Sequence, residues 1–189
     1  MSYQTEEDNR TILKIREMLK ELPPMCREVF LSLSNTATPK TRLGYATDLR
    51  IFFKYLCEEN PKFEGRQMRS ITVEDLEQIK VLDINEYLDY LSYYVKTENG
   101  CVEEFTNREN GKARKLAAVR KLFNYSYKNE KLGGNPAEMV DSPRLREKEI
   151  VRLEPNEVAS LLDSIEEGTN LSQTQKKYHS KTAARDLAI

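Results

Sequence analysis

The sequence has few cysteines, one histidine and no tryptophan. Its three cysteines, Cys26, Cys57 and Cys101, are widely spaced, which excludes a disulfide scaffold and a CxxC metal site and is typical of reduced thiols in a cytosolic protein. A catalytic triad or a histidine-based metal site would have to be built around His179, which falls in an expected polar loop. We therefore expect no metal and no cofactor.

Long apolar runs are also missing, since no segment approaches the 18 or so apolar residues that a membrane span needs. No charged N-terminal region followed by an apolar segment opens the sequence, so a secretory signal is not expected. Seven glycines and seven prolines exclude collagenous and low-complexity chains. The 189 residues suffice for one cytoplasmic domain with a real core, or for a small domain and part of another.

A net charge of one sign is lacking as well, because 30 basic residues face 31 acidic ones. The balance is uneven along the chain: residues 67–105 carry three basic and nine acidic groups, whereas residues 106–152 carry twelve basic and six acidic groups. A segment with a charge of +6 on one face attracts a polyanion such as nucleic acid. The alternative from charge alone is a helix with a solvated basic face.

Helical periodicity covers most of the sequence, and no segment shows the alternation of a strand. Thr38 followed by Pro39 predicts the start of a helix that runs to about Asn60. In the helix expected over residues 84–97, Val95 is spaced for burial. The sequence therefore predicts an all-α fold. Its other expected segments are helices over 5–21, 73–80, 109–130 and 156–166, loops over 100–108 and 168–181, and a last segment capped by Thr182.

The expected helix over residues 109–130 separates into two faces when residues are placed at 100° intervals. The apolar face holds Ala113, Leu116, Ala117, Phe123 and Tyr127. The opposite, basic face holds Arg114, Lys115, Ala118, Lys121, Tyr125 and Lys128.

A basic helix face with a small residue at its centre favours close approach to DNA. Ala118 lets the helix come near, and lysines and arginines reach phosphates or base edges. Arg120 falls near the apolar face, so we expect it to pair internally or to reach around the helix. Lys115 and Lys121, in mid-helix, are expected nearest the groove, and the alternative is an ordinary lysine-rich surface.

The expected helix over residues 39–60 shows a weaker form of the same pattern. Lys40, Gly44, Thr47 and Lys54 lie opposite its apolar stripe. Glycine in a helix costs up to about 1 kcal/mol relative to alanine, and close approach to a partner would explain it. At the helix start, Thr41 and Arg42 are placed to bind a phosphate together with free backbone N–H groups, or to form a solvated helix end.

Several segments together resemble the tyrosine recombinases, the phage-integrase family, in its Xer-like form. The resemblance rests on the order and spacing of these segments, covers about residues 38–189, and leaves residues 1–37 uncovered. The matching segments are Thr41–Leu56, Ala113–Tyr125, Asn135-Pro136-Ala137, Pro143-Arg144-Leu145, Leu153–Val158 and Thr182–Ile189.

The resemblance implies an orthogonal helical bundle of the SAM-like integrase core-binding type. The expected parts are an N-terminal helical extension over residues 1–37, a core-binding domain over 38–140, a linker over 141–152, and the start of a catalytic domain over 153–189. In this family the two domains close around duplex DNA, with the first and last long helices of the core-binding domain toward the major groove.

The family breaks and rejoins DNA through a tyrosine that forms a 3′-phosphotyrosine link, assisted by arginines, a lysine and histidine-type residues. The resemblance implies that all of these positions lie beyond Ile189. We therefore expect no catalytic residue and no strand cleavage in this chain. Tyr125, Tyr127 and Tyr178 are not expected to be the nucleophile, because they precede the family's first catalytic arginine.

The expected partners are double-stranded DNA and other recombinase subunits bound to it, with no membrane. Two alternatives remain open: a helical module that self-associates through Ile12, Ile15 and Leu19, and a non-catalytic regulator derived from an integrase. The candidate DNA-contacting residues are Lys40, Thr41, Arg42, Lys54, Lys112, Arg114, Lys115, Arg120, Lys121, Lys128, Arg144 and Arg146, the last two by position in the linker.

Overall fold

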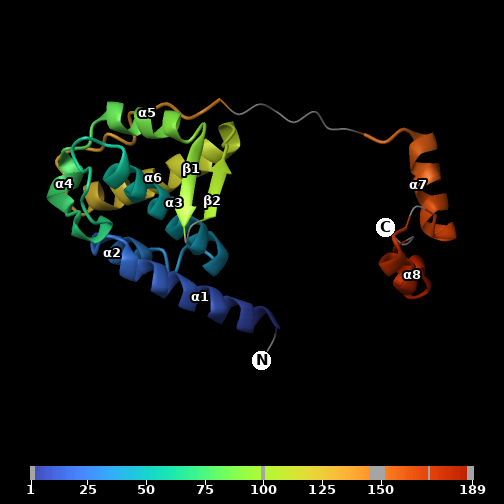
Figure 1. Cartoon of the computed structure of the whole chain (residues 1–189). Coiled ribbons are helices and arrows are strands. Elements are labelled where there is room, and N and C mark those ends of the chain that lie inside the picture. The colour runs from blue at the N-terminus through green and yellow to red at the C-terminus, as the bar shows by residue number, and fades with distance from the viewer. Residues whose placement is uncertain (1–2, 99–100, 145–151, 170, 187–189) are drawn as a thin grey trace. The chain divides into compact units, whose positions relative to one another are not determined.

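The computed structural model describes residues 3–98, 101–144, 152–169 and 171–186. The chain divides into two compact units, Met1–Arg146 and Glu147–Ile189 (Figure 1). Almost all of the secondary structure is helical, as the sequence predicts. The helices are α1 (Tyr3–Glu21), α2 (Met25–Ser32), α3 (Pro39–Glu58), the 3-10 turn η1 (Met68–Ser70), α4 (Val73–Glu77), α5 (Val81–Tyr90), α6 (Glu109–Lys128), α7 (Pro155–Glu167) and α8 (Gln173–Asp186).

Helix α3 is the central element of the first unit, and both α1 and α6 pack against it. It begins where the sequence predicts, because the Thr38 side chain caps the helix by accepting a hydrogen bond from the Thr41 backbone N–H at 3.2 Å, and Pro39 follows at the first helical position. Its apolar stripe, which includes Leu49, Phe53 and Leu56, is buried. This helix therefore sets the position of α6, the other helix with a candidate DNA-binding face.

Helices α1 and α2, which fall in the segment expected as an extension, share one core with the rest of the first unit. Ile15 of α1 and Cys26, Val29 and Phe30 of α2 are fully buried in the same apolar cluster as the stripe of α3. A fully buried side chain of this size contributes about 1.5–3 kcal/mol. The first two helices are thus part of the bundle itself, and the core does not begin at residue 38.

A β-hairpin replaces the end of one expected helix and the loop after it, which corrects the prediction. Strand β1 (Tyr94–Glu98) pairs antiparallel with β2 (Cys101–Phe105), and Val95, expected to be buried, is 43% exposed. Aromatic and β-branched residues favour strands, and Asn99-Gly100, which lies outside the described residues, is a sequence typical of tight hairpin turns. These local preferences outweigh the helical spacing of the apolar residues.

Stacked aromatic rings attach the base of this hairpin to α3. Tyr55 of α3 contacts Tyr90 at 5.0 Å between ring centroids, Tyr90 stacks on Tyr94 at 5.1 Å, and Tyr94 stacks on Phe105 at 5.2 Å. Offset aromatic pairs at such distances add to the stability that burial alone provides. The hairpin is therefore an integral part of the first unit.

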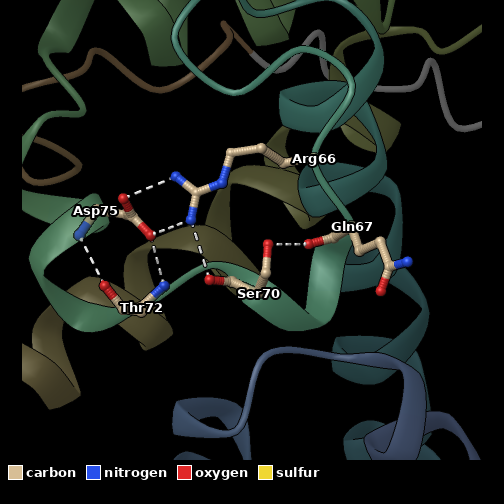
Figure 2. A network of polar contacts seen from close by, with 5 residues as sticks. All are labelled: Arg66, Gln67, Ser70, Thr72 and Asp75. Atoms are coloured by element: carbon tan, nitrogen blue, oxygen red, sulfur yellow. Dashed lines mark hydrogen bonds and ion pairs between the residues drawn. The ribbon is translucent and has the colours of Figure 1, made fainter.

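A polar network fixes the short segment between α3 and α5 (Figure 2). Arg66 donates to both carboxylate oxygens of Asp75 at 2.9 and 2.8 Å, and to the Ser70 carbonyl at 3.0 Å. Asp75 also accepts from the Thr72 backbone N–H at 2.8 Å, and Thr72 caps α4, which begins at Val73, the residue where the sequence predicts a helix start. The Arg66 hydrogen bonds are the largest cause that lowers the pKa of Asp75 to about 2.

The second unit is a pair of helices, α7 and α8. The loop expected over residues 168–181 is mostly helix, and its start is a capping box in which Ser172 and Gln175 bond to each other's backbone N–H groups at 3.3 and 2.9 Å. His179, expected in that loop, lies in α8 and its Nε2 is 2.6 Å from the Ile165 carbonyl. Gly168 has a φ of 67°, and a Cβ there would be 2.9 Å from the His179 ring.

Candidate nucleic-acid interface

Helix α6 is rotated about its axis relative to the sequence-based expectation. Lys115 and Ala118, expected on the exposed basic face, are buried, with Lys115 only 5% exposed. Ala117 and Tyr127, expected on the apolar face, are exposed. The exposed line of α6 is therefore Asn110, Arg114, Ala117, Lys121 and Lys128.

Lys115 is buried because a polar site inside the bundle receives its ammonium group. Its Nζ donates to Asn107 Oδ1 at 2.7 Å, and Asn107 in turn bonds to the Leu91 carbonyl. Burial is the largest effect on the pKa of Lys115 and lowers it, the charge of Arg114 acts in the same direction, and Asp48 opposes both. Its expected position nearest a DNA groove is therefore wrong.

Asp48 and Arg114 join α3 to α6 at the surface. Asp48 is 0% exposed, whereas the Arg114 side chain is 55% exposed, and Nη2 of Arg114 lies 2.8 Å from Asp48 Oδ1. Burial raises the pKa of Asp48, and the charges of Arg114 and Lys115 counteract part of that rise. A Cβ at Gly44, one turn earlier on α3, would be 3.7 Å from Arg114 Nη1. The guanidinium group therefore lies over residues 44–48 of α3.

The beginning of α3 contributes polar side chains to the same unit. Lys40 and Thr41 are exposed, and the Thr41 hydroxyl is 2.9 Å from the hydroxyl of the capping residue Thr38. Arg42 is half-buried, and its Nε has no hydrogen-bond partner among the described residues. Thr47 is exposed one turn further on, where its hydroxyl donates to the Leu43 carbonyl at 3.0 Å. The exposed line of α3 is therefore Lys40, Thr41 and Thr47, and Gly44 between them is half-buried beside Arg114.

The remaining lysines of the two helices differ in their surroundings. Lys40, Lys121 and Lys128 are exposed and form no ion pair or hydrogen bond with any residue that the structure describes. Lys54 is half-buried and lies 3.6 Å from Glu58. Unpaired, exposed ammonium groups are available to a phosphate backbone, so the first three fit the expected type of contact best.

Two further candidates lie on a different groove, between α5, α6 and residues 141–144. Lys112 donates to Ser92 Oγ at 2.6 Å and lines this groove together with Arg144. The groove is also lined by the acidic residues Asp89, Glu109 and Asp141. Mixed charge does not favour a polyanion. Arg146 lies outside the described residues.

Arg120 binds the segment that follows α6. It donates to the carbonyls of Ala137 and Val140, the first at 3.1 Å, and to Ser142 Oγ at 2.7 Å. The expectation that Arg120 pairs internally is thus confirmed. Because these bonds occupy its guanidinium group, Arg120 anchors the exit of the bundle in this structure.

The structure places Gly44 and Asp48 of α3 beside Arg114 of α6, and Lys121 and Lys128 lie further along the exposed line of α6. Sequence reasoning did not single out Asp48 and Asn107, which position Arg114 and Lys115. The available signal was an aspartate beside Leu49 within the buried stripe of α3.

Among the described residues, no group of His, Cys, Asp and Glu side chains is arranged to hold a metal ion. None of the described helices combines the length and the apolar character that a membrane span requires.

Two curated proteins match the chain over most of its length. The chain is 30% identical over 163 residues to the tyrosine recombinase XerC of Caldanaerobacter subterraneus subsp. tengcongensis, which covers 83% of this chain and 44% of that protein. The chain is related to the tyrosine recombinases. The XerC of Chlorobaculum tepidum gives the same result, with 28% identity over 167 residues, 85% of this chain and 44% of the relative.

The chain itself spans less than half the length of the curated proteins that it matches. No family model matches the chain, and no solved structure matches it significantly. The family relationship therefore rests on the two XerC proteins, and the assignment of DNA contacts rests on the arrangement of the residues described above.

Proposed function

We propose that the chain is the DNA-binding portion of a site-specific tyrosine recombinase, and that it contacts duplex DNA through the exposed lines of α3 and α6. The observation that carries the proposal is the exposure of Lys40 at the start of α3 and of Arg114, Lys121 and Lys128 along α6, in a relative of the XerC proteins. Other recombinase subunits on the same duplex are the expected protein partners.

The proposed contacts fall into two groups. Lys40, Lys121 and Lys128 are exposed and unpaired within the described chain, so they suit phosphate contacts that set affinity but not sequence preference. Ala117 lies between Arg114 and Lys121 on the exposed line of α6. A small side chain there permits the close approach that the sequence analysis assigned to Ala118.

The self-association alternative loses support from Ile15 and Leu19, two of the three residues on which it was based. Ile15 is buried in this chain's own core, and Leu19 packs against the same cluster. Residues engaged in an intramolecular core are not available to a second copy. DNA binding is therefore the function that the surface favours.

The test is a salt titration of binding to a duplex of about 30 bp, three helical turns. Counterion release makes log affinity fall linearly with log salt, with a slope of roughly 0.9 per phosphate contact. We expect Lys121→Ala and Lys128→Ala each to reduce that slope by roughly 0.9, and the double variant to show both reductions.

Lys14→Ala is the matched control, because Lys14 is an exposed lysine on α1 and its loss changes the net charge equally. Helicity and thermal unfolding measured on each variant separate loss of binding from loss of fold. An unchanged slope and affinity in the Lys121→Ala/Lys128→Ala variant, with the fold intact, would mean that this line is only a solvated face.

A further inference from the structure

Asp48 is an unusual residue for the inner side of a helix. Its carboxylate is fully buried, and neither oxygen accepts a hydrogen bond of good geometry from any described residue. The hydroxyl of Tyr87, whose pKa is raised by burial and by the charge of Asp48, also has no hydrogen-bond partner there. Since burying a charge without hydrogen bonds is costly, the stability of the fold does not account for this aspartate.

The partner of Asp48 lies at the surface. Arg114 has no ion pair or hydrogen bond with another residue of the described chain, and more than half of its side chain is exposed. The ion pair uses one edge of the guanidinium through Nη2, while Nη1 lies next to Gly44, which has no side chain to cover it. The donors that do not face Asp48 are therefore presented at the crossing of α3 and α6.

We propose that Asp48 is a positioning residue that orients Arg114 for contact with a base edge in the major groove. This proposal rests on the proposed function, because it requires that the α3–α6 crossing faces duplex DNA. An arginine that donates two parallel hydrogen bonds to the O6 and N7 atoms of guanine must have its planar group fixed in advance.

The carboxylate also distinguishes a base contact from a phosphate contact. A buried negative charge next to the guanidinium repels a phosphate and cancels part of the attraction that an unpaired arginine would provide. A base edge carries only partial charges, so it experiences much less of this repulsion. The Asp48–Arg114 pair therefore lowers the general affinity for DNA while it fixes the orientation of the guanidinium group. The unpaired Lys121 and Lys128 instead add to general affinity.

The experiment uses the full 189-residue chain and a library of duplexes with a randomised central segment. Bound duplexes are sequenced, and binding to the unselected library is titrated with salt. For Asp48→Asn we expect several-fold tighter binding to the unselected library and a slope steeper by roughly 0.9, since one freed cation reaches a phosphate. The preference for guanine at one position of the enriched sequence should fall by roughly tenfold or more.

Arg114→Ala should lose the same preference without a change in slope. Asp89→Asn is the control, because it removes an exposed carboxylate from α5 and changes the net charge equally. Helicity and thermal unfolding of every variant are measured alongside binding.

Three results would overturn the proposal. An Asp48→Asn chain that enriches the same sequence as strongly as the wild type removes the positioning role. An Arg114→Ala chain with a shallower slope and an unchanged preference makes Arg114 a phosphate contact. A wild-type chain that binds DNA but enriches no sequence removes the base contact and leaves the proposed function intact, whereas failure of the wild type to bind any duplex rejects both.

Discussion

Asp75 and Asp48 each face an arginine from another segment of the first unit, and the two pairs differ in how the carboxylate is supplied with hydrogen bonds. Asp75 receives two from Arg66 and one from the Thr72 backbone, as Figure 2 shows. Asp48 receives none of good geometry, although Arg114 Nη2 is 2.8 Å away. The pKa of Asp75 is lowered to about 2, whereas burial raises the pKa of Asp48.

This difference in hydrogen bonding means that the Arg66–Asp75 pair stabilises the fold, whereas the Arg114–Asp48 pair fixes the orientation of a side chain. Hydrogen bonds to the charged form of Asp75 more than compensate its partial burial, so the pair strengthens the connection between α3 and α4. At Asp48 burial outweighs the two neighbouring cations, so the folded state tolerates the charge at a cost. An ion-pair distance alone therefore does not reveal whether a pair stabilises the fold.

The largest expected effect is the loss of stability when the Arg66–Asp75 pair is removed. Asp75→Ala removes the two hydrogen bonds that Arg66 donates to this carboxylate and the one that the Thr72 backbone N–H donates to it, and we expect a loss on the order of 3 kcal/mol in the free energy of unfolding. For a chain of this size that corresponds to a fall of roughly 6–12 °C in Tm. Urea titration and thermal unfolding measure it.

The matched control is Asp89→Ala, because Asp89 is exposed on α5 and should change stability by no more than about 0.5 kcal/mol. Equal losses in the two variants would show that the network of Figure 2 does not stabilise the fold.

The sequence predicts most helices well because their signals are local. Thr38 with Pro39, and Thr72 with Asp75, each mark a helix start that the structure confirms. The capping box of Ser172 and Gln175 is an equally local signal, although it falls within the segment that was expected to be a loop. The hairpin could not be read from apolar spacing, because Val95 fits a helical stripe, and its identity depends on cross-strand pairing with β2.

The candidate site was harder to predict than the helices. Lys115 was assigned to the surface because lysine is charged, but Asn107, eight residues away, provides a buried acceptor for it. The orientation of Arg114 depends on Asp48, which is distant in sequence and is brought near by helix packing. Long-range polar pairs of this kind have no local pattern, so a helical-wheel analysis places the face wrongly by about one residue.

The second prediction concerns the unequal exposure of the Asp48–Arg114 pair. Arg114→Ala leaves a fully buried carboxylate with only Lys115 nearby, and we expect a loss on the order of 2 kcal/mol. Asp48→Asn leaves a half-exposed arginine that water hydrates, so the expected change is within about 1 kcal/mol. Urea unfolding of both single variants and the double variant measures the coupling. The Arg114→Ala/Asp48→Asn chain should be more stable than Arg114→Ala alone, and simple addition of the two losses would contradict the comparison.

The third prediction is that the two aspartates respond to pH in opposite directions. Because the pKa of Asp75 is lowered, its contribution is present above its ordinary value of 3.8 and is lost as the pH falls toward about 2. Because the pKa of Asp48 is raised, the folded state binds its proton more tightly, and this contribution is lost as the pH rises through the folded value. Relative to the wild type, Asp48→Asn should therefore gain stability as the pH rises above the ordinary aspartate value of 3.8.

Unfolding by urea at several pH values measures these differences. A stability difference between Asp48→Asn and the wild type that stays constant with pH would mean that Asp48 is not the titrating group. The groups whose charges act on it are Arg114 and Lys115 of α6, and the neighbouring phenols are Tyr87 of α5 and Tyr94 of β1.

The smallest expected effect is that of Gly44→Ala. This substitution tests the space around Arg114 without changing the charge of Arg114 or Asp48. A Cβ at this position would be 3.7 Å from Arg114 Nη1, an ordinary contact distance, so Gly44→Ala should fit without moving the guanidinium. Alanine favours the helix over glycine by up to about 1 kcal/mol, so the variant should be more stable by roughly that amount. Its sequence preference for duplex DNA should match that of the wild type, whereas Gly44→Leu should cover the guanidinium and weaken the preference. A destabilised Gly44→Ala chain would show that Arg114 fills this space more tightly than the contact distance indicates.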